Sequence, residues 1–201
     1  MAATRGATND IERAVRLFYQ VRDGIRYDPY TVGLIPEMYK ASHVLLVGRG
    51  FCLPKTNLLA ACARAVGISA AIGLADVKNH LCTEKLRRAM GGKDRFLHHG
   101  YALLYVDGRW VKAAPAFNIE LCEKFGVLPT DFDGRSDALL QPIDARGKKH
   151  MEYLVDHGFF ADFPFERVIG DFKAYYPESL FQHSDDAVQF EDEHLSAKPS
   201  K

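Results

Sequence analysis

The chain has no excess of charge of either sign, because 26 lysines and arginines balance 26 aspartates and glutamates. A neutral chain exerts no overall attraction on nucleic acid or on an anionic membrane surface. It also contains no apolar run near the roughly 18 residues that a membrane-spanning helix needs. We therefore expect no nucleic-acid partner, no membrane association and a cytoplasmic location.

Cysteine is scarce, and the four cysteines form no CxxC pair but are dispersed as Cys52, Cys62, Cys82 and Cys122. Dispersed thiols are typical of a reduced cytosolic protein and do not indicate a disulfide framework. Any cysteine with a special role is therefore expected to be catalytic and not structural.

Metal-ligand spacing is also missing. His80 and Cys82 stand two residues apart, and His98 with His99 would point to opposite faces of a strand. Neither pair has the separation usual for a zinc site, so we expect no metal and no other cofactor.

Apolar residues make up 47% of the 201 residues, which is enough to bury one sizeable core. We expect a single domain over residues 1–183. From residue 184 the sequence becomes acidic and then rich in alanine, lysine, proline and serine, with little apolar content after Phe190. Residues 184–201 are therefore predicted to form a flexible acidic tail.

Two amphipathic helices are predicted in the first third of the chain. Asn9 and Glu12 have the spacing of a capping box, and the helix that they begin is expected to end at Gly24. Cys52 begins the second helix, in which Pro54 occupies a first-turn position that tolerates proline. This helix is expected to run to about Val66 and to pack against a strand over residues 68–77.

A cysteine in the first turn of a helix is exposed to the positive end of the helix dipole, which favours the thiolate. The free backbone N–H groups at the same place can bind an oxyanion. Arg49 is expected to favour the thiolate further, and we expect Arg49, Gly50 and Phe51 to line the substrate site. The same pattern also fits a buried and inert cysteine.

A β-hairpin is predicted downstream. Residues 98–106 and 109–116 flank Asp107-Gly108, a pair that favours a type I′ turn. A two-residue turn places His99 opposite Ala116, with Ala114 and Asn118 as its diagonal neighbours on the same face.

Of these two neighbours, only Asn118 has a side chain that can accept a hydrogen bond from an imidazole and so fix its tautomer. Pro115 limits this expectation, because it can end the ladder before Asn118. Tyr101 lies on the same predicted face as His99. It is expected either to complete the core or to wall an acyl pocket.

Two segments resemble the transglutaminase-like superfamily of papain-type cysteine enzymes. The segment GRGFCLPKTNLLAACARAVGISA (residues 48–70) resembles the signature in which a glycine-flanked cysteine begins a helix. The segment HGYALLYVDGRWVKAAP (residues 99–115) is similar to the family's histidine strand, turn and tryptophan strand. The family's histidine stands eleven residues before the tryptophan, which fits His99 and Trp110 and not His98. The resemblance covers roughly residues 10 to 120.

The family's third motif is missing. Its aspartate stands four residues after the tryptophan and before a proline, and this position is Ala114 here. The chain therefore resembles a divergent member in which Asn118 takes over the orienting role, as in papain-type Cys-His-Asn sites. Asp131, Asp133 and Asp144 are the other candidates for that role.

The resemblance implies an α+β fold of the papain-like, transglutaminase-like type, in which an N-terminal helical part and the cysteine helix pack on an antiparallel sheet. It implies Cys52 as nucleophile and His99 as base in acyl transfer through a thioester, on a peptide, amide or small-molecule acyl substrate. Two alternatives stay open: an inactive papain-fold binding module, and a biosynthetic enzyme that uses the same dyad for addition, cyclisation or condensation. The acyl acceptor and the oligomeric state are left open by the sequence.

Overall fold

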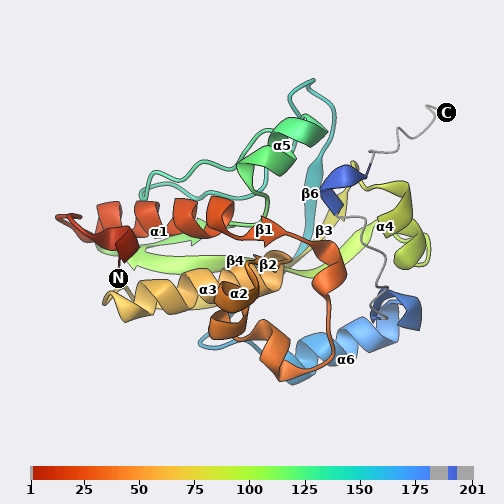
Figure 1. Ribbon diagram of the computed structural model, residues 1–201, viewed down its shortest axis with the longest axis horizontal. Helices are drawn as coiled ribbons and strands as arrows, with labels where there is room; N and C mark the ends of the chain where they lie inside the picture. Colours follow the sequence, from red (N-terminus) through yellow and green to blue (C-terminus); the bar gives the residue numbers. More distant parts are fainter. Residues whose placement is uncertain (1, 182–189, 194–201) are drawn as a thin grey trace.

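The computed structural model describes residues 2–181 and 190–193, and its centre is a four-stranded antiparallel sheet with the order β5-β4-β3-β6 (Figure 1). The strands are β3 (Ala70–Asn79), β4 (Arg95–Val106), β5 (Arg109–Ala113) and β6 (Met151–Phe160). Two short strands, β1 (Arg26–Tyr27) and β2 (Arg49–Gly50), form a separate parallel pair.

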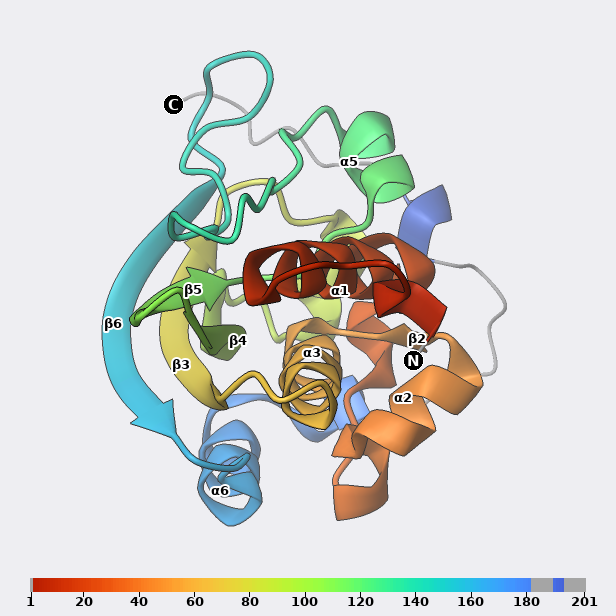
Figure 2. The same ribbon diagram turned by 90° about the vertical axis from the view of Figure 1, so that its left-hand side faces the viewer.

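The helices gather mainly on one side of the sheet. Figure 2 shows the sheet as a curved wall, with α1 and α3 on its concave side and α6 beyond the end of β6. The α-helices are α1 (Asp10–Gly24), α2 (Ala41–Val47), α3 (Cys52–Ala65), α4 (Glu84–Ala89), α5 (Ile119–Phe125) and α6 (Phe165–Tyr175). Short 3-10 helices span Ala2–Thr4, Pro29–Thr31, Pro36–Tyr39, Glu178–Phe181 and Phe190–Asp192. The expected α+β fold, with the cysteine helix packed on an antiparallel sheet, is confirmed.

The predicted cap of the first helix is present, but the Glu12 carboxylate accepts from the Thr8 N–H and not from the Asn9 N–H. The Asn9 side chain accepts a hydrogen bond from the Glu12 backbone N–H at 2.9 Å. Leu17, Phe18 and Val21 form the buried stripe of this helix, which packs against α3. Local sequence therefore fixes both the start of α1 and the face that it buries.

The hairpin has the register that the sequence predicts. Tyr105 pairs with Trp110, and both turn residues, Asp107 and Gly108, have the positive φ of a type I′ turn. The ladder stops at Ala113, however, and does not reach His99.

At the far end of β4 the chain pairs only with β3, where His99 lies opposite Ala75. The register shifts between Ala75 and Val77, and His98 adopts a positive φ of 53°. Irregular pairing of this kind changes the direction of side chains near the end of a strand.

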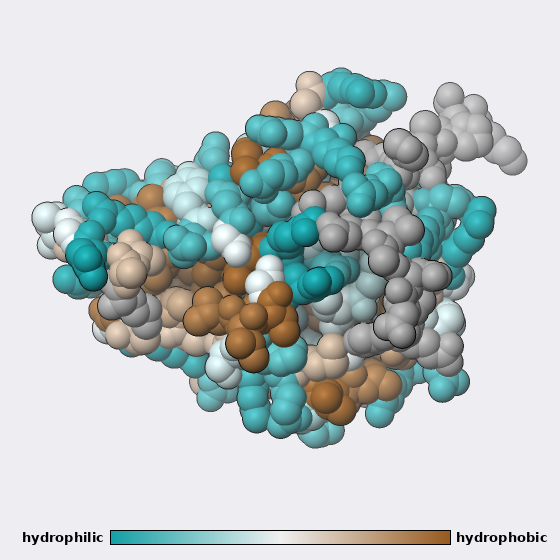
Figure 3. Space-filling model, viewed as in Figure 1, coloured by the Kyte–Doolittle hydropathy of each residue, from teal (hydrophilic) through white to brown (hydrophobic). Residues whose placement is uncertain are grey.

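An exposed apolar patch covers one face of α2. Leu45, Leu46 and Val47 are exposed, and Figure 3 shows a hydrophobic area over this helix. The opposite face contributes Val44 to the core. The helix therefore divides its apolar residues between the core and the surface.

Within the predicted tail, the structure describes residues 190–193, and these residues pack against the domain. Phe190 is buried, and its ring packs edge-on against Tyr27 at 5.8 Å between centroids. Glu193 is also buried and accepts hydrogen bonds from Tyr30 and Thr83. The buried Phe190 ring and the two hydrogen bonds to the Glu193 carboxylate explain why residues 190–193 pack against the rest of the protein. The rest of the predicted tail lies outside the described residues.

Candidate active site

Cys52 is the first residue of α3, as the sequence predicts, and the approach to it is fixed by the backbone. Strand β2 pairs with β1, and the Gly50 carbonyl accepts a hydrogen bond from Asp28 N–H at 3.2 Å. A side chain at Gly50 would lie 3.2 Å from Pro54 in the first turn of α3. The absence of a Cβ at Gly50 therefore lets the chain turn tightly into the helix.

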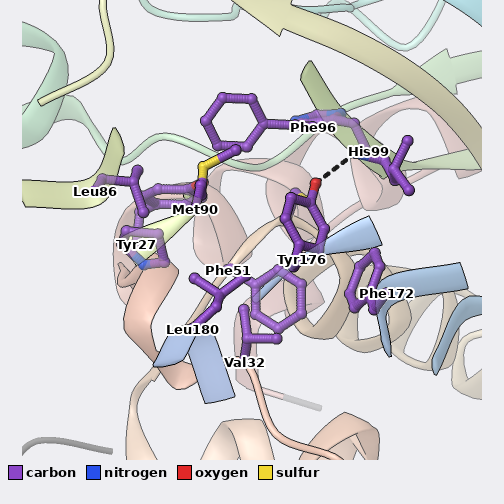
Figure 4. A pocket seen from close by; sticks show the side chains of 13 residues that line it. Tyr27, Val32, Phe51, Leu86, Met90, Phe96, His99, Phe172, Tyr176 and Leu180 are labelled. Carbon is purple, nitrogen blue, oxygen red and sulfur yellow. Dashed lines mark hydrogen bonds between the residues drawn. The ribbon is translucent and has the colours of Figure 1, made fainter. Parts of the chain in front are cut away.

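Cys52 and His99 both line one narrow cavity, on whose wall Figure 4 labels His99. The space open to the centre of a water molecule is about 50 Å³, which is room for a few waters. Among the described residues, the lining of the cavity contains no acidic side chain, lysine or arginine. The described residues that line it are Tyr27, Pro29, Val32, Phe51, Cys52, Leu86, Met90, Phe96, Leu97, His99, Phe172, Tyr176 and Leu180. The cavity is suited to an uncharged group.

The Cys52 sulfur is almost fully enclosed, since the residue is only 8% exposed. Burial raises the pKa of this thiol to about 11, although backbone N–H groups of Gly100, Leu53 and Cys52 itself act in the opposite direction. In this state the sulfur is a thiol at neutral pH. The expectation that the helix N-terminus would make Cys52 a thiolate is wrong for this state, because desolvation has the larger effect.

Arg49 does not contribute to this site. Its guanidinium lies 3.8 Å from the Asp28 carboxylate, is 57% exposed and faces a different surface hollow. The sequence placed Arg49 near the thiol because of its short separation from Cys52, but β2 directs its side chain to solvent.

His99 is 4% exposed, and neither nitrogen of its ring has a hydrogen-bond partner among the described residues. Burial lowers the pKa of this imidazole to about 4. The ring packs edge-on against Tyr153, with 6.4 Å between centroids. His99 is therefore neutral at physiological pH, and one ring nitrogen has a free lone pair that can accept a proton.

Asn118 does not orient His99 in this structure. Its side-chain oxygen accepts a hydrogen bond from Tyr27 N–H at 3.0 Å, and its amide nitrogen donates to Glu120 at 2.8 Å. The contact predicted from the hairpin register is not formed, because the ladder ends at Ala113 and the Asn118 side chain bonds to Tyr27 and Glu120 instead. Pro115 can end the ladder before Asn118, as the sequence indicated, and the ladder does end before Asn118.

The other candidates for the orienting role have different partners. Asp131 pairs with Arg22, while Asp133 and Asp144 accept backbone N–H groups of their own loops. The position that carries aspartate in related motifs is Ala114, which is fully buried. No described acidic side chain therefore bonds to the His99 ring.

The remaining predicted site residues divide into two groups. Phe51 lines the cavity, whereas Gly50 shapes only the approach to it. Tyr101 projects from the face of β4 opposite α3, where it packs against Ala75 and donates a hydrogen bond to Asp156 at 3.2 Å. Tyr101 is not among the residues that line the cavity.

Sequence reasoning missed the part of the wall that comes from the C-terminal third of the chain. Phe172 and Tyr176 stand four residues apart and so share one face at the end of α6. The Tyr176 hydroxyl accepts a hydrogen bond from Leu97 N–H at 2.8 Å, drawn as the dashed line in Figure 4. The aromatic i, i+4 pair was a visible signal, but nothing local indicated which cavity it faces.

These features define a class of protein: an α+β fold in which a helix beginning with cysteine packs against an antiparallel sheet that carries a histidine. Residues 2–115 match the model of the transglutaminase-like superfamily, and the chain belongs to this superfamily. The matched segment includes both Cys52 and His99 and ends before Asn118. Comparisons with curated proteins and with solved structures gave no match. Membership of the superfamily suggests cysteine-dependent chemistry of the papain-like kind.

No helix among residues 2–181 and 190–193 is long and apolar enough to cross a membrane.

Proposed function

We propose that the protein is a cysteine-dependent acyl-transfer enzyme in which Cys52 is the nucleophile and His99 is the base. The observation that supports this proposal most strongly is that both side chains line the same narrow cavity, although 46 residues separate them in the sequence. A neutral thiol and a neutral imidazole that line one cavity without being hydrogen-bonded to each other suit a coupled step, in which the base takes the proton as the sulfur attacks.

In this mechanism the Cys52 sulfur forms a bond to the carbonyl carbon of the substrate while its proton passes to His99. The negative charge that develops on the carbonyl oxygen is stabilised by backbone N–H groups near the sulfur, those of Cys52, Leu53 and Gly100. His99 then gives the proton to the leaving group, and a thioester remains on Cys52. Water or an amine releases the acyl group in a second step.

The cavity favours a small, uncharged acyl group as substrate. Its walls are aromatic and aliphatic. Tyr27 and Phe51 come from the N-terminal third of the chain, and Phe172 and Leu180 come from the C-terminal third. A charged group would lose its hydration without gaining a partner among these residues. We therefore expect aromatic or short aliphatic acyl groups to react faster than acyl groups that carry a charge.

A second candidate is a binding module that keeps the fold without catalysis. Ala114 in place of an aspartate, and the unpartnered His99 ring, favour it. A biosynthetic enzyme that uses the same pair for addition, cyclisation or condensation is a third. Because burial raises the pKa of the Cys52 thiol whichever candidate is right, turnover and not thiol titration distinguishes them.

The test is the release of 4-nitrophenol from 4-nitrophenyl esters of small apolar acids. We expect turnover by the unaltered protein, a loss of at least about 100-fold in His99→Gln and a complete loss in Cys52→Ala. Cys62→Ser is the matched control, because Cys62 is a half-buried cysteine of the same helix that lies outside the cavity. Equal rates in Cys52→Ala and the unaltered protein would contradict the proposal.

A further inference from the structure

A second group of chemically active side chains lies on the sheet, separate from the cavity. Asp76 on β3, His98 on β4 and His157 on β6 each offer one ligand atom, and these atoms lie within 4.8 Å of one another. Among the residues that the structure describes, this is the group of three histidine, cysteine or acidic residues close enough to hold a metal ion. From this geometry we propose that Asp76, His98 and His157 form a binding site for a divalent transition metal ion of the zinc type.

The irregular pairing of the strands brings these residues together. The register of β3 shifts at Asp76 against both neighbouring strands, and His98 has a positive φ. Asp76 Oδ1 accepts hydrogen bonds from His98 N–H and from His157 Nε2, both at 2.9 Å. The rings of His98 and His157 lie 4.7 Å apart between centroids. A regular ladder would not aim all three side chains at one point.

The hydrogen bonds of His98 prepare it as a metal ligand. Its Nε2 lies 2.7 Å from a carboxylate oxygen of Asp171, which acts as acceptor, so we assign the ring proton to Nε2. The other nitrogen, Nδ1, then carries a lone pair, and it is buried without a partner. A histidine that donates one ring N–H to a carboxylate and offers its other nitrogen has the arrangement usual for metal-binding histidines.

The ligand types indicate the kind of ion. Two imidazoles and one carboxylate suit zinc and related divalent transition metals, and three protein ligands leave a coordination position open. Arg95 approaches Asp76 through the other carboxylate oxygen, Oδ2, at 2.6 Å. An ion at Oδ1 would therefore replace the hydrogen bond of His157 to this oxygen and leave that of the His98 N–H in place. The positive charge of Arg95 weakens the attraction for a cation, but this side chain is partly exposed and can turn toward solvent.

The group can be reached from solvent. The His157 side chain is 19% exposed and the Asp171 side chain 51%, whereas Asp76 and His98 form the enclosed floor. An ion entering past His157 replaces one internal hydrogen bond, between His157 and Asp76, with two metal–ligand bonds. The ligands come from three strands that lie far apart in the chain, which explains why sequence spacing gave no sign of a site.

The test uses zinc and cobalt ions with the full-length protein after treatment with a chelator. Equilibrium dialysis against Zn²⁺ should show one bound equivalent, and His157→Gln and Asp76→Asn should each weaken binding by at least about tenfold. His80→Gln is the matched control, because His80 also pairs with a carboxylate, that of Glu152 at 3.2 Å, but is outside the group. Its affinity should equal that of the unaltered protein.

Two further measurements guard against a misleading result. Co²⁺ bound at the proposed site should show d–d bands without the near-ultraviolet thiolate band that a cysteine ligand produces. Asp171→Asn changes only a partly exposed side chain, and it should fold normally and still weaken binding by roughly tenfold, since outer carboxylates have effects of this size. The proposal is overturned if the unaltered protein binds no Zn²⁺, if a thiolate band appears, or if His157→Gln and Asp171→Asn bind as tightly as His80→Gln. The result is independent of the proposed acyl transfer, because none of these residues lines the cavity.

Discussion

Two effects oppose each other at the Cys52 sulfur. The start of a helix stabilises a thiolate by about 2 kcal/mol at most. Burial raises the pKa from 9.0 to about 11, which corresponds to about 3 kcal/mol in favour of the thiol. Desolvation therefore dominates, and activation of the thiol depends on the base or on entry of a ligand.

The rate of alkylation by iodoacetamide as a function of pH tests this balance. Mass spectrometry of peptides should show that modification of Cys52 still rises above pH 9, because only the thiolate reacts. Cys62, which is half-buried, provides the internal comparison and should react faster at pH 8. A Cys52 profile that reaches its plateau below pH 7 would show that the thiolate is already present.

A carboxylate in place of Ala114 should change both the pKa of His99 and the rate of ester turnover. Ala114 is fully buried and follows the last paired residue of β5, Ala113. The register of the hairpin, if continued, would place it diagonal to His99, whose ring has no partner among the described residues, so we expect a carboxylate there to reach the imidazole. In Ala114→Asp we expect the pKa of His99 to rise from about 4 and ester turnover to increase by about tenfold or more.

Histidine titration by NMR measures the first effect, and nitrophenol release measures the second. Ala114→Asn is the matched control, since it can form the hydrogen bond without adding a charge. If the pKa of His99 were the same in Ala114→Asp as in the unaltered protein, the diagonal placement would be wrong.

Cys52 and His99 could be predicted from the sequence as residues of one site because each lies in a local motif. Cys52 follows a glycine-rich turn at a helix start, and His99 has a fixed distance from Trp110. Asn118 could not be placed in the same way. Its position depends on where the ladder ends and on a hydrogen bond to Tyr27, which lies 91 residues away.

At the scale of elements, the closest approach is between α3 and β4. A Cβ on Gly100 would lie 2.9 Å from Thr56 Oγ1 and 3.3 Å from the Leu53 backbone. Only glycine therefore lets the strand lie so close to the first turn of α3. This contact brings the Gly100 N–H to the Cys52 sulfur.

Two glycine substitutions should have opposite effects on the free energy of unfolding. Gly100→Ala should lower it by about 1–3 kcal/mol, because the added methyl group separates α3 from β4. Gly170→Ala should raise it by up to about 1 kcal/mol, because this residue lies within α6 and a Cβ would meet nothing within 4 Å. Urea unfolding of both variants measures the difference. A more stable Gly100→Ala protein would contradict the close packing.

The hairpin and the irregular end of β4 differ in how far sequence could predict them. The Asp107-Gly108 turn determines the register of β4 and β5 locally, and this register was predicted correctly. The shift near Asp76 depends on pairing between β3, β4 and β6, which is long-range. Periodicity contains no information about such a shift, so the group around Asp76 could not be derived.

For the whole molecule, the cavity depends on both ends of the chain. Cys52 and His99 lie within the segment that matches the superfamily, residues 2–115, but Phe172, Tyr176 and Leu180 come from beyond it. Those residues reach the cavity through contacts such as Tyr176 with the Leu97 backbone. The fold class was predicted from the two motifs, whereas the C-terminal wall of the cavity required the structure.

Buried histidines should make the protein sensitive to mild acid. Burial lowers the pKa values of both His99 and His150 from 6.5 to about 4. The unfolded chain therefore takes up protons below about pH 6.5 that the folded protein does not, so stability falls as the pH drops from 6.5 toward 4. The loss is about 3 kcal/mol for each histidine at the lower limit.

Urea unfolding between pH 7 and pH 4.5 measures this dependence. In His150→Gln the fall in stability should be shallower, because one of the two groups is removed. A slope unchanged in that variant would show that His150 does not contribute to the acid sensitivity.

The most direct test of the proposed chemistry is the intact mass of the protein after brief reaction with a 4-nitrophenyl ester of a small apolar acid. We predict one added acyl group, located on Cys52 by peptide analysis and formed more slowly in His99→Gln. An acyl group found on another cysteine, or an equal rate of acylation in His99→Gln, would contradict the pairing of Cys52 with His99.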